Sequence, residues 1–304
     1  MKGLELCHKY FMTYGEEMIK KKFYSYRHKI AAGLVGQGSE CFGFDDAISR
    51  DHDWGPGFCL WLDNEDFNAI GIQLQEEYEK LPEEFMGFVR KADISSGKRV
   101  GVFKINDFYE WFTGLTQAPE NHKQWINLLD EYLCACTNGK VFYDPLGKFS
   151  DIRKKFLSFY PEDIRKVKIA AKCISCAQSG QYNFARSLKR QESFAVMYAQ
   201  NAFCSDIISL VFLLNRKFAP FYKWKHRAVR ELPVLGALTY EGIDKMLEQN
   251  DYQKKIEIIE NICSAVISEL KAEGLSYSES DFLLDHGRSV QERIKDNNVR
   301  ARAI

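Results

Sequence analysis

Hydrophobic and polar positions in the first half of the chain follow helical spacing in some segments and strand-like spacing in others. Apolar residues between Leu4 and Phe23 recur at helical spacing and end in a run of lysines, which predicts an amphipathic helix with cations at its C-terminal end. Short apolar runs at Ile30–Val35 and Trp54–Leu62 lie beside Gly-rich turns and predict buried strands. Helical spacing returns at Asp66–Leu81, and further short strands are predicted at 85–91, 98–105 and 139–147.

Strand-like patterns end near residue 150, and helical spacing dominates the rest of the chain. The predicted helices are 161–179, 183–215, a Pro-bounded stretch around 220–232, 240–247, 252–274 and 280–297. The sequence therefore predicts an α+β protein with two domains: a mixed β-sheet domain over residues 1–150 and an all-α helical bundle over residues 151–304.

The charge balance differs between the two halves, although the formal net charge is zero. Residues 1–150 carry 17 Lys and Arg against 23 Asp and Glu, and residues 151–304 carry 25 against 19. Residues 186–230 hold nine of those cations, which suggests an anionic ligand. A long nucleic acid usually requires a basic balance across a whole domain, so the modest excess favours a small phosphorylated ligand over nucleic acid.

Compartment signals are sparse. No stretch reaches the roughly 18 apolar residues that a membrane span needs, and the charges near the N-terminus do not suit a signal peptide. Nine cysteines, an odd number, indicate reduced thiols rather than a disulfide framework. We therefore predict a cytoplasmic protein with no membrane partner; the pattern leaves the oligomeric state open.

The most informative motif is Gly38-Ser39 followed after a short spacer by Asp51-His52-Asp53. In a strand, Asp51 and Asp53 would point to the same face, because side chains alternate. Paired carboxylates suit Mg²⁺, which proteins hold with one or two carboxylates together with substrate phosphates. Gly38 lets the backbone approach a phosphate, and Ser39 can donate a hydrogen bond to it. The motif therefore predicts a phosphate and metal site.

This arrangement resembles the signature of the DNA polymerase beta-like nucleotidyltransferases, which include bacterial aminoglycoside and lincosamide nucleotidyltransferases. More narrowly, the segments GLVGQGSECFGFDDAISRDHDWGP (33–56) and LNRKFAPFYKWKHRAVRELP (214–233) resemble a bacterial family that is described as a domain of unknown function within that fold. The two segments together extend the resemblance over most of the chain.

The resemblance implies that a nucleoside triphosphate, with ATP as the first candidate, and Mg²⁺ bind between a catalytic domain and a helical bundle. Gly38 and Ser39 would hold the triphosphate, and Asp51 and Asp53 would ligate the metal and act in catalysis. The superfamily commonly supplies a third carboxylate from a later strand, but the segment 99–105 contains none. Asp107 lies just beyond it and would serve as a metal ligand only if that strand ends early.

Further candidates lie in the helical half. Arg186 and Arg190 are four residues apart, so on a helix both can reach one anion; a solvated face is the alternative. Glu192 lies about 160° around the helix from Arg190. Because antibiotic nucleotidyltransferases can take their general base from the helical domain, the resemblance makes Glu192 a candidate base.

Aromatic and cationic residues alternate around Pro220 in the segment 215–227. Lys223 and Arg227 are candidate nucleotide-binding residues, because cations in such a setting can stack on a base or hold a phosphate. The alternative is a corner at the start of a helix whose aromatic side chains fill the bundle.

Other polar residues near the motif have simpler interpretations. Glu40 is expected in solvent, because its charge would oppose a phosphate. Asp45 and Asp46 are expected to cap a short helix. The pairs Cys134-x-Cys136 and Cys173-x-x-Cys176 lack a neighbouring His and lie in apolar helical patterns, so packing is favoured over zinc binding.

The predicted function is Mg²⁺-dependent transfer of a nucleoside monophosphate to the hydroxyl group of a small molecule. Two alternatives remain. The missing third carboxylate allows a relative that binds nucleotide as a regulatory module without turnover. The neutral charge balance also allows a transferase that modifies a protein.

Overall fold

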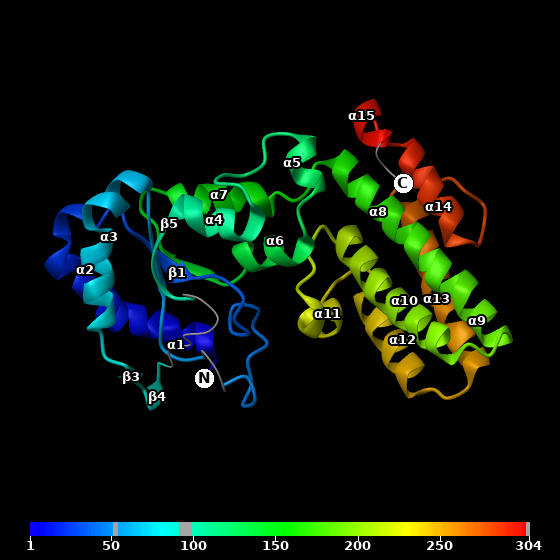
Figure 1. Cartoon of the computed structure of the whole chain (residues 1–304), viewed down its shortest axis with the longest axis horizontal. Helices are drawn as coiled ribbons and strands as arrows, with labels where there is room; N and C mark the ends of the chain where they lie inside the picture. The colour runs from blue at the N-terminus through cyan, green and yellow to red at the C-terminus, as the bar shows by residue number, and fades with distance from the viewer. Residues whose placement is uncertain (51–53, 91–98, 302–304) are drawn as a thin grey trace. The chain divides into compact units, whose positions relative to one another are not determined.

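The computed structural model describes residues 1–50, 54–90 and 99–301 of the 304-residue chain (Figure 1). The chain divides into two compact units. Unit 1 comprises Met1–Glu120 and Leu128–Ser158, and unit 2 comprises Asn121–Asn127 and Phe159–Ile304. The structure is an α+β protein, with a mixed sheet in unit 1 and helices throughout the described part of unit 2.

A four-stranded mixed sheet organises unit 1, with the strand order β5-β2-β1-β6. Strand β1 pairs antiparallel with β2 and β6, whereas β2 pairs parallel with β5. The strands are β1 (Ala31–Leu34), β2 (Cys59–Leu62), β5 (Gly101–Lys104) and β6 (Lys140–Tyr143). All residues of β1 and β2 are buried, which explains why both read as short continuous apolar runs.

Two strand predictions needed correction. The strand predicted from Trp54 begins only at Cys59, because Gly55-Pro56-Gly57 interrupts it. The segment predicted as one strand at 85–91 is a small hairpin of β3 (Glu84–Phe85) and β4 (Phe88–Val89). Its turn residues Met86 and Gly87 both have positive φ, as a two-residue hairpin turn requires.

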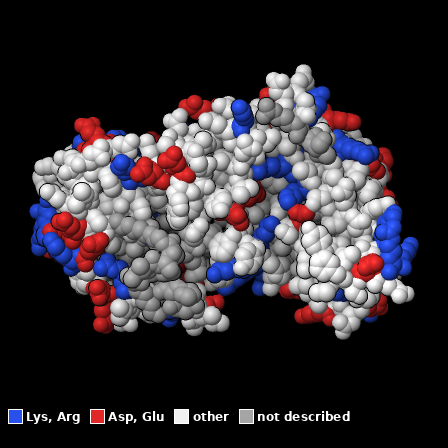
Figure 2. Space-filling view, in the orientation of Figure 1, with Lys and Arg blue, Asp and Glu red and all other residues white. Residues whose placement is uncertain are grey.

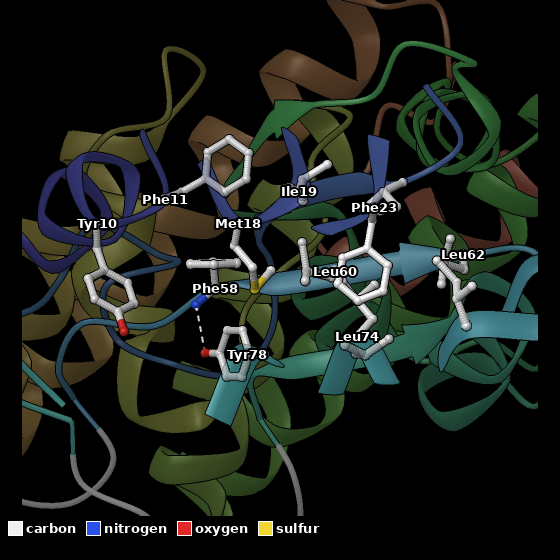
Figure 3. Close-up of a cluster of buried hydrophobic side chains, with 14 residues drawn as sticks. Tyr10, Phe11, Met18, Ile19, Phe23, Phe58, Leu60, Leu62, Leu74 and Tyr78 are labelled. Atoms are coloured by element: carbon white, nitrogen blue, oxygen red, sulfur yellow. Dashed lines mark hydrogen bonds between the residues drawn. The ribbon is translucent and has the colours of Figure 1, made fainter. Parts of the chain in front are cut away.

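Helices cover both faces of the sheet. The side chains of β2 point alternately to each face and contact helices on both sides. Leu60 and Leu62 join a cluster with Tyr10, Phe11 and other residues of the N-terminal helices (Figure 3). The helices of unit 1 are α1 (Gly3–Tyr10), α2 (Glu16–Lys22), α3 (Asn64–Glu79), α4 (Ile105–Thr113), α6 (Asp130–Thr137) and α7 (Lys148–Leu157). A π-helical turn, Phe11–Gly15, joins α1 to α2, so the predicted helix from Leu4 to Phe23 runs almost without interruption.

Trp61 of β2 points to the opposite face of the sheet, and its contact with α7 shows why unit 1 includes that helix. Its ring stacks on that of Phe149 in α7, with 3.9 Å between centroids, and meets Phe108 of α4 edge-on. Phe149 and Phe156 are both fully buried, and Phe156 stacks on Tyr109 of α4, so α7 packs into unit 1 at both of these positions. Residue 150, where the sequence places the boundary, therefore lies inside a helix of unit 1, and the division falls after Ser158.

Unit 2 is built from helices of very different length. They are α5 (His122–Ile126), α8 (Glu162–Cys176), α9 (Ala185–Lys189), α10 (Ser193–Leu214), α11 (Tyr222–Val229), α12 (Gly236–Glu248), α13 (Tyr252–Ala272), α14 (Leu283–Glu292) and α15 (Asn297–Arg300). A π-helical segment, Ala177–Phe184, joins α8 to α9. The single helix predicted at 183–215 is interrupted because Gln191 adopts a left-handed conformation with φ of 58°.

Helix α10 corrects the expectation that no segment is apolar and long enough to span a membrane. Asp206 is its only charged residue, and its length and composition pass that test. The core helix of a soluble protein passes the same test, and 56% of the tested window is buried inside the structure. The helix is therefore weak evidence for a membrane segment, and a cytoplasmic location stays a prediction.

Candidate functional site

The Gly38-Ser39 pair lies in a tight turn that is separated from the end of β1 by three residues. The Cys41 amide donates to the Gly38 carbonyl at 2.9 Å, and the Phe44 amide donates to the Ser39 carbonyl at 3.0 Å. A side chain at position 38 would overlap Nη1 of Arg99, and its Cβ would lie 2.6 Å from both carboxylate oxygens of Glu40. Two charged side chains therefore pack against the backbone at Gly38, and a larger residue here would displace their ends.

Glu40 and Arg99 form an ion pair that the sequence did not predict. Glu40 was expected in solvent, but only 2% of it is exposed, and Arg99 is largely buried. Room for the carboxylate comes from Gly38 and from Gly3, where an added Cβ would lie 2.7 Å from Cβ of Glu40. No motif marks this pair, because Arg99 reaches the turn only through the parallel pairing of β5 with β2.

Asp45 caps a helix, as its residue type suggested, but the helix is α1, which is distant in sequence. Its Oδ2 accepts a hydrogen bond from the amide of Gly3, the first residue of α1, at 2.8 Å, and another from Nε1 of Trp54 at 3.3 Å. Asp46 accepts hydrogen bonds from the amides of Ile48 and Ser49 and stabilises a local turn. Both carboxylates therefore organise the backbone between the two halves of the motif.

Asp51, His52 and Asp53 lie outside the described residues. The structure describes the residues on either side of them. The guanidinium of Arg50 lies 4.8 Å from the ring centroid of Trp54, and Nε1 of Trp54 donates a hydrogen bond to Asp45. The carbonyl of Gly55 accepts a hydrogen bond from Sγ of Cys7 in α1. The described flanks of the Asp-x-Asp segment therefore contact the same part of unit 1 as the segment that follows Gly38 and Ser39.

Asp107 lies away from this region. Strand β5 ends early, at Lys104, and Asp107 is an exposed residue in the first turn of α4. The register pairs Gly33 with Cys59 and Cys59 with Gly101, so the turn after β1 lies at the end of the sheet where β2 and β5 begin. Asp107 follows the other end of β5, and the structure does not bring it to the turn at Gly38.

The cationic candidates of unit 2 fall into two separate groups. Arg186 lies in α9 and donates to the hydroxyl of Tyr182, whereas Arg190 is the residue that ends α9. Glu192 immediately precedes α10, is exposed, and forms no side-chain capping bond. Because the helix ends between Arg190 and Glu192, the angular relation expected for a continuous helix does not apply.

Lys223 and Arg227 lie in α11, and both are exposed. Lys225 of the same helix donates to the carbonyl of Ser205, twelve residues and about 18 Å along α10 from Ser193. Figure 1 shows α9 and α11 at opposite ends of α10. The structure therefore does not bring the arginines around α9 together with the cations of α11.

Thiols near the motif are held in the protonated form. Burial raises the pKa of Cys7 to about 12 and raises that of Cys41 well above its usual value. Cys173 and Cys176 lie in the core of unit 2, where burial likewise raises the pKa of both thiols. Among the described residues, no group of three His, Cys, Asp or Glu side chains is placed to hold a metal ion.

Comparisons with known proteins give limited matches. Residues 125–225 match the family described as Domain of unknown function (DUF4037), which covers less than half of the chain. No curated protein matches the chain. The crystal structure of a nucleotidyltransferase-like protein from Exiguobacterium sibiricum 255-15 is similar over 91% of this chain and 79% of that chain, with 10% sequence identity and a TM-score of 0.39. A TM-score at this level does not establish a shared fold.

Proposed function

We propose that the protein is a nucleotidyltransferase that transfers a nucleoside monophosphate from a nucleoside triphosphate, ATP in the first instance, to a hydroxyl group of a small molecule. The observation that supports this most directly is the turn at Gly38 and Ser39. It follows a buried strand in the middle of the sheet and has the guanidinium of Arg99 against its glycine. A glycine turn lets a phosphate approach the backbone, and Arg99 would add its charge only by exchanging the carboxylate of Glu40 for that phosphate.

A bound magnesium ion would require the two aspartates of the motif as ligands. The described residues contain no cluster of three potential metal ligands, and the charge of Glu40 is already balanced by Arg99. We propose Asp51 and Asp53 of the motif as its protein ligands, with triphosphate oxygens completing the set. Bound Mg²⁺ would offset the negative charge that develops on the phosphates.

The reaction follows from the acceptor hydroxyl. Its oxygen attacks the α-phosphorus, the bond between that phosphorus and the bridging oxygen breaks, and pyrophosphate leaves with the bonding electrons. The proton of the hydroxyl passes to a base, for which we propose Glu192. Glu192 is exposed and its carboxylate makes no hydrogen bond with a described residue, so it is available to accept a proton.

A small acceptor agrees better with the surface than a nucleic acid does. Figure 2 shows Lys and Arg side chains interspersed with Asp and Glu on the visible face, separated by uncharged surface. Formal net charge is zero, and a long polyanion would be held by a broad field of one sign. Because the structure separates Arg186 and Arg190 from Lys223 and Arg227, we propose one of these two groups, not both, as contacts for the phosphates of the triphosphate.

The decisive experiment is isothermal titration of the full chain with a non-hydrolysable ATP analogue, with and without Mg²⁺. Binding should depend on Mg²⁺ and disappear in Asp51→Asn and in Asp53→Asn. Asp46→Asn is the matched control, because Asp46 is an exposed aspartate in the same segment whose carboxylate accepts hydrogen bonds from the amides of Ile48 and Ser49. If the wild-type chain binds no analogue of ATP, GTP, CTP or UTP, the proposal is wrong.

A second candidate function is a regulatory module that binds nucleotide without turnover. The position of Asp107 favours it, because this candidate third metal ligand follows the other end of β5 and does not reach the turn. Release of pyrophosphate separates the two functions. An acceptor screen, including proteins as acceptors, that yields pyrophosphate supports the transferase, whereas Mg²⁺-dependent binding without release in any mixture supports the module.

A further inference from the structure

A cavity of about 410 Å³ lies within unit 2, between α5 and the segment that begins α15. Its volume is within the range of pockets that bind small molecules. From α5 it is lined by Asn121, His122, Lys123 and Ile126, and from the other side by Asp296 and Val299 among others. None of these residues belongs to the motif around Gly38 and Ser39.

The wall around Asp296 is held in place by α8. Both carboxylate oxygens of Asp163 accept hydrogen bonds from backbone amides, one from Lys295 at 3.1 Å and one from Asp296 at 2.9 Å. Nζ of Lys166, one turn along α8, donates to the carbonyl of Arg293 at 2.9 Å. The chain that enters α15 is therefore fixed on a long helix.

His122 is oriented by Asp296 from across the cavity. Nδ1 of His122 lies 3.1 Å from Oδ2 of Asp296, and this hydrogen bond holds the pKa of the Asp296 carboxyl below its usual value. An ionised Asp296 keeps the proton on Nδ1 of the imidazole. Nε2 of His122 makes no hydrogen bond with any described residue, so it is available to a ligand; it accepts a hydrogen bond in this tautomer and donates one to an anion when the ring carries a second proton.

Helix α5, which forms the other wall of the cavity, is also anchored. Trp125 is buried, and its ring contacts that of Tyr160 with 5.6 Å between centroids. Asn121 caps α5 by accepting a hydrogen bond from the amide of Gln124 at 3.1 Å. The side chains that line the cavity therefore project from a helix with a fixed start and a buried anchor.

Lys123 favours an anionic ligand in this cavity. The carboxylate of Asp296 is already satisfied, because it accepts hydrogen bonds from His122 and from the amides of Asn298 and Val299. Lys123 makes no ion pair within the described ranges of the chain. Lys123 therefore offers a cation that no described acidic residue offsets, next to the apolar side chains of Ile126 and Val299, whereas His122 is already paired with Asp296.

We propose that this cavity is a binding site for a small organic acid, whose carboxylate or phosphate group is held by Lys123 and by Nε2 of the doubly protonated imidazole of His122, and whose apolar part packs on Ile126 and Val299. A carboxylate and a phosphate monoester offer the same oxygen acceptors to these donors. The site is independent of nucleotidyl transfer, and it gives unit 2 a ligand of its own.

Histidine ¹⁵N resonances of the full chain provide the test, with sodium benzoate, phenyl phosphate and benzyl alcohol as probes. Benzoate and phenyl phosphate at up to about 10 mM, enough to occupy a millimolar site, should shift Nε2 of His122, and uncharged benzyl alcohol should not. Lys123→Met should weaken binding of both acids about tenfold. The control variant His28→Gln removes an exposed histidine of unit 1 and should leave the affinities unchanged.

Three outcomes would overturn the site. The first is the absence of any shift of His122 with both acids. The second is an equal response to benzyl alcohol, which would show an apolar cavity without anion recognition. The third is full retention of affinity in both Lys123→Met and His122→Gln. A preference between benzoate and phenyl phosphate identifies which acid group the cavity favours.

Discussion

Arg165 in α8 donates from Nη2 to both carboxylate oxygens of Glu273, at 3.1 and 2.8 Å, although none of the arginine side chain is exposed. The same guanidinium donates to the carbonyls of Leu213 and Leu214 at the end of α10. One side chain therefore satisfies the last carbonyls of one helix and pairs with the residue that follows α13.

Replacement of Arg165 should destabilise unit 2 severely. Arg165→Met leaves buried carbonyls without donors and Glu273 without its cation, and we expect a loss of about 3–5 kcal/mol in the free energy of unfolding. Arg216→Met is the control, because its ion pair with Glu162 is about half exposed and should contribute less than about 1 kcal/mol. Urea unfolding measures both; equal losses would contradict the prediction.

The buried ion pair of Glu40 and Arg99 should show a strong dependence on both partners. Arg99→Met leaves a buried carboxylate without its cation and should cost about 3–5 kcal/mol. The double variant that adds Glu40→Gln removes the uncompensated charge, so it should be more stable than Arg99→Met alone. Thermal and urea unfolding of the two variants test this, and additive losses would show that the pair is not coupled.

Stability of unit 2 should fall at acid pH through Asp163. Burial alone would raise the pKa of Asp163, but the amides of Asp296 and Lys295 outweigh it and hold the pKa below its usual value. Such a carboxyl stabilises the folded chain above its unfolded pKa of about 3.9, and this contribution is lost as the pH falls through the lower folded value.

Asp163→Asn should therefore flatten the decline in the free energy of unfolding below about pH 4. The control Asp281→Asn changes an exposed aspartate of the same unit and should keep the wild-type slope. Urea unfolding between about pH 2.5 and about pH 6 measures both slopes, because this range includes the ordinary aspartate pKa of about 3.9. A parallel decline in Asp163→Asn would refute the assignment.

Cysteine reactivity should be low in the folded chain. Burial raises the pKa of Cys7, Cys134 and Cys204 to about 12, so little thiolate is present near neutral pH. Titration with a disulfide reagent at pH 8, below the ordinary thiol pKa of about 8.5, should modify the native chain far more slowly than the urea-unfolded chain. Rapid modification of the native buried thiols Cys173 and Cys176 would contradict this.

The sequence predicted the elements well where one physical signal dominates. Ile30–Val35 is apolar throughout because β1 is buried on both faces, and the spacing after Leu4 gives a helix because one face meets the core. The prediction failed where the backbone conformation of one residue determines the end of an element. At Gln191, a left-handed conformation interrupts a pattern that is otherwise helical.

The candidate site was only partly accessible from the sequence. Gly38 and Ser39 form the expected turn after a buried strand, because a local motif determines it. The ion pair of Glu40 with Arg99 joins residues 59 positions apart, and it depends on strand pairing that no local pattern encodes. The position of Asp107 depends likewise on the direction of β5 in the sheet.

Helix α5 has a consequence for the order in which the chain folds. Residues 121–127 belong to unit 2, yet the chain returns to unit 1 for residues 128–158. During synthesis from the N-terminus, Trp125 emerges before Tyr160, and His122 precedes Asp296 by 174 positions. Closing such distant contacts is slow. Unit 1 can therefore fold while α5, which lies between its two parts in the sequence, still lacks its packing partners. Helix α5 can pack fully only after the last helices of unit 2 have been synthesised.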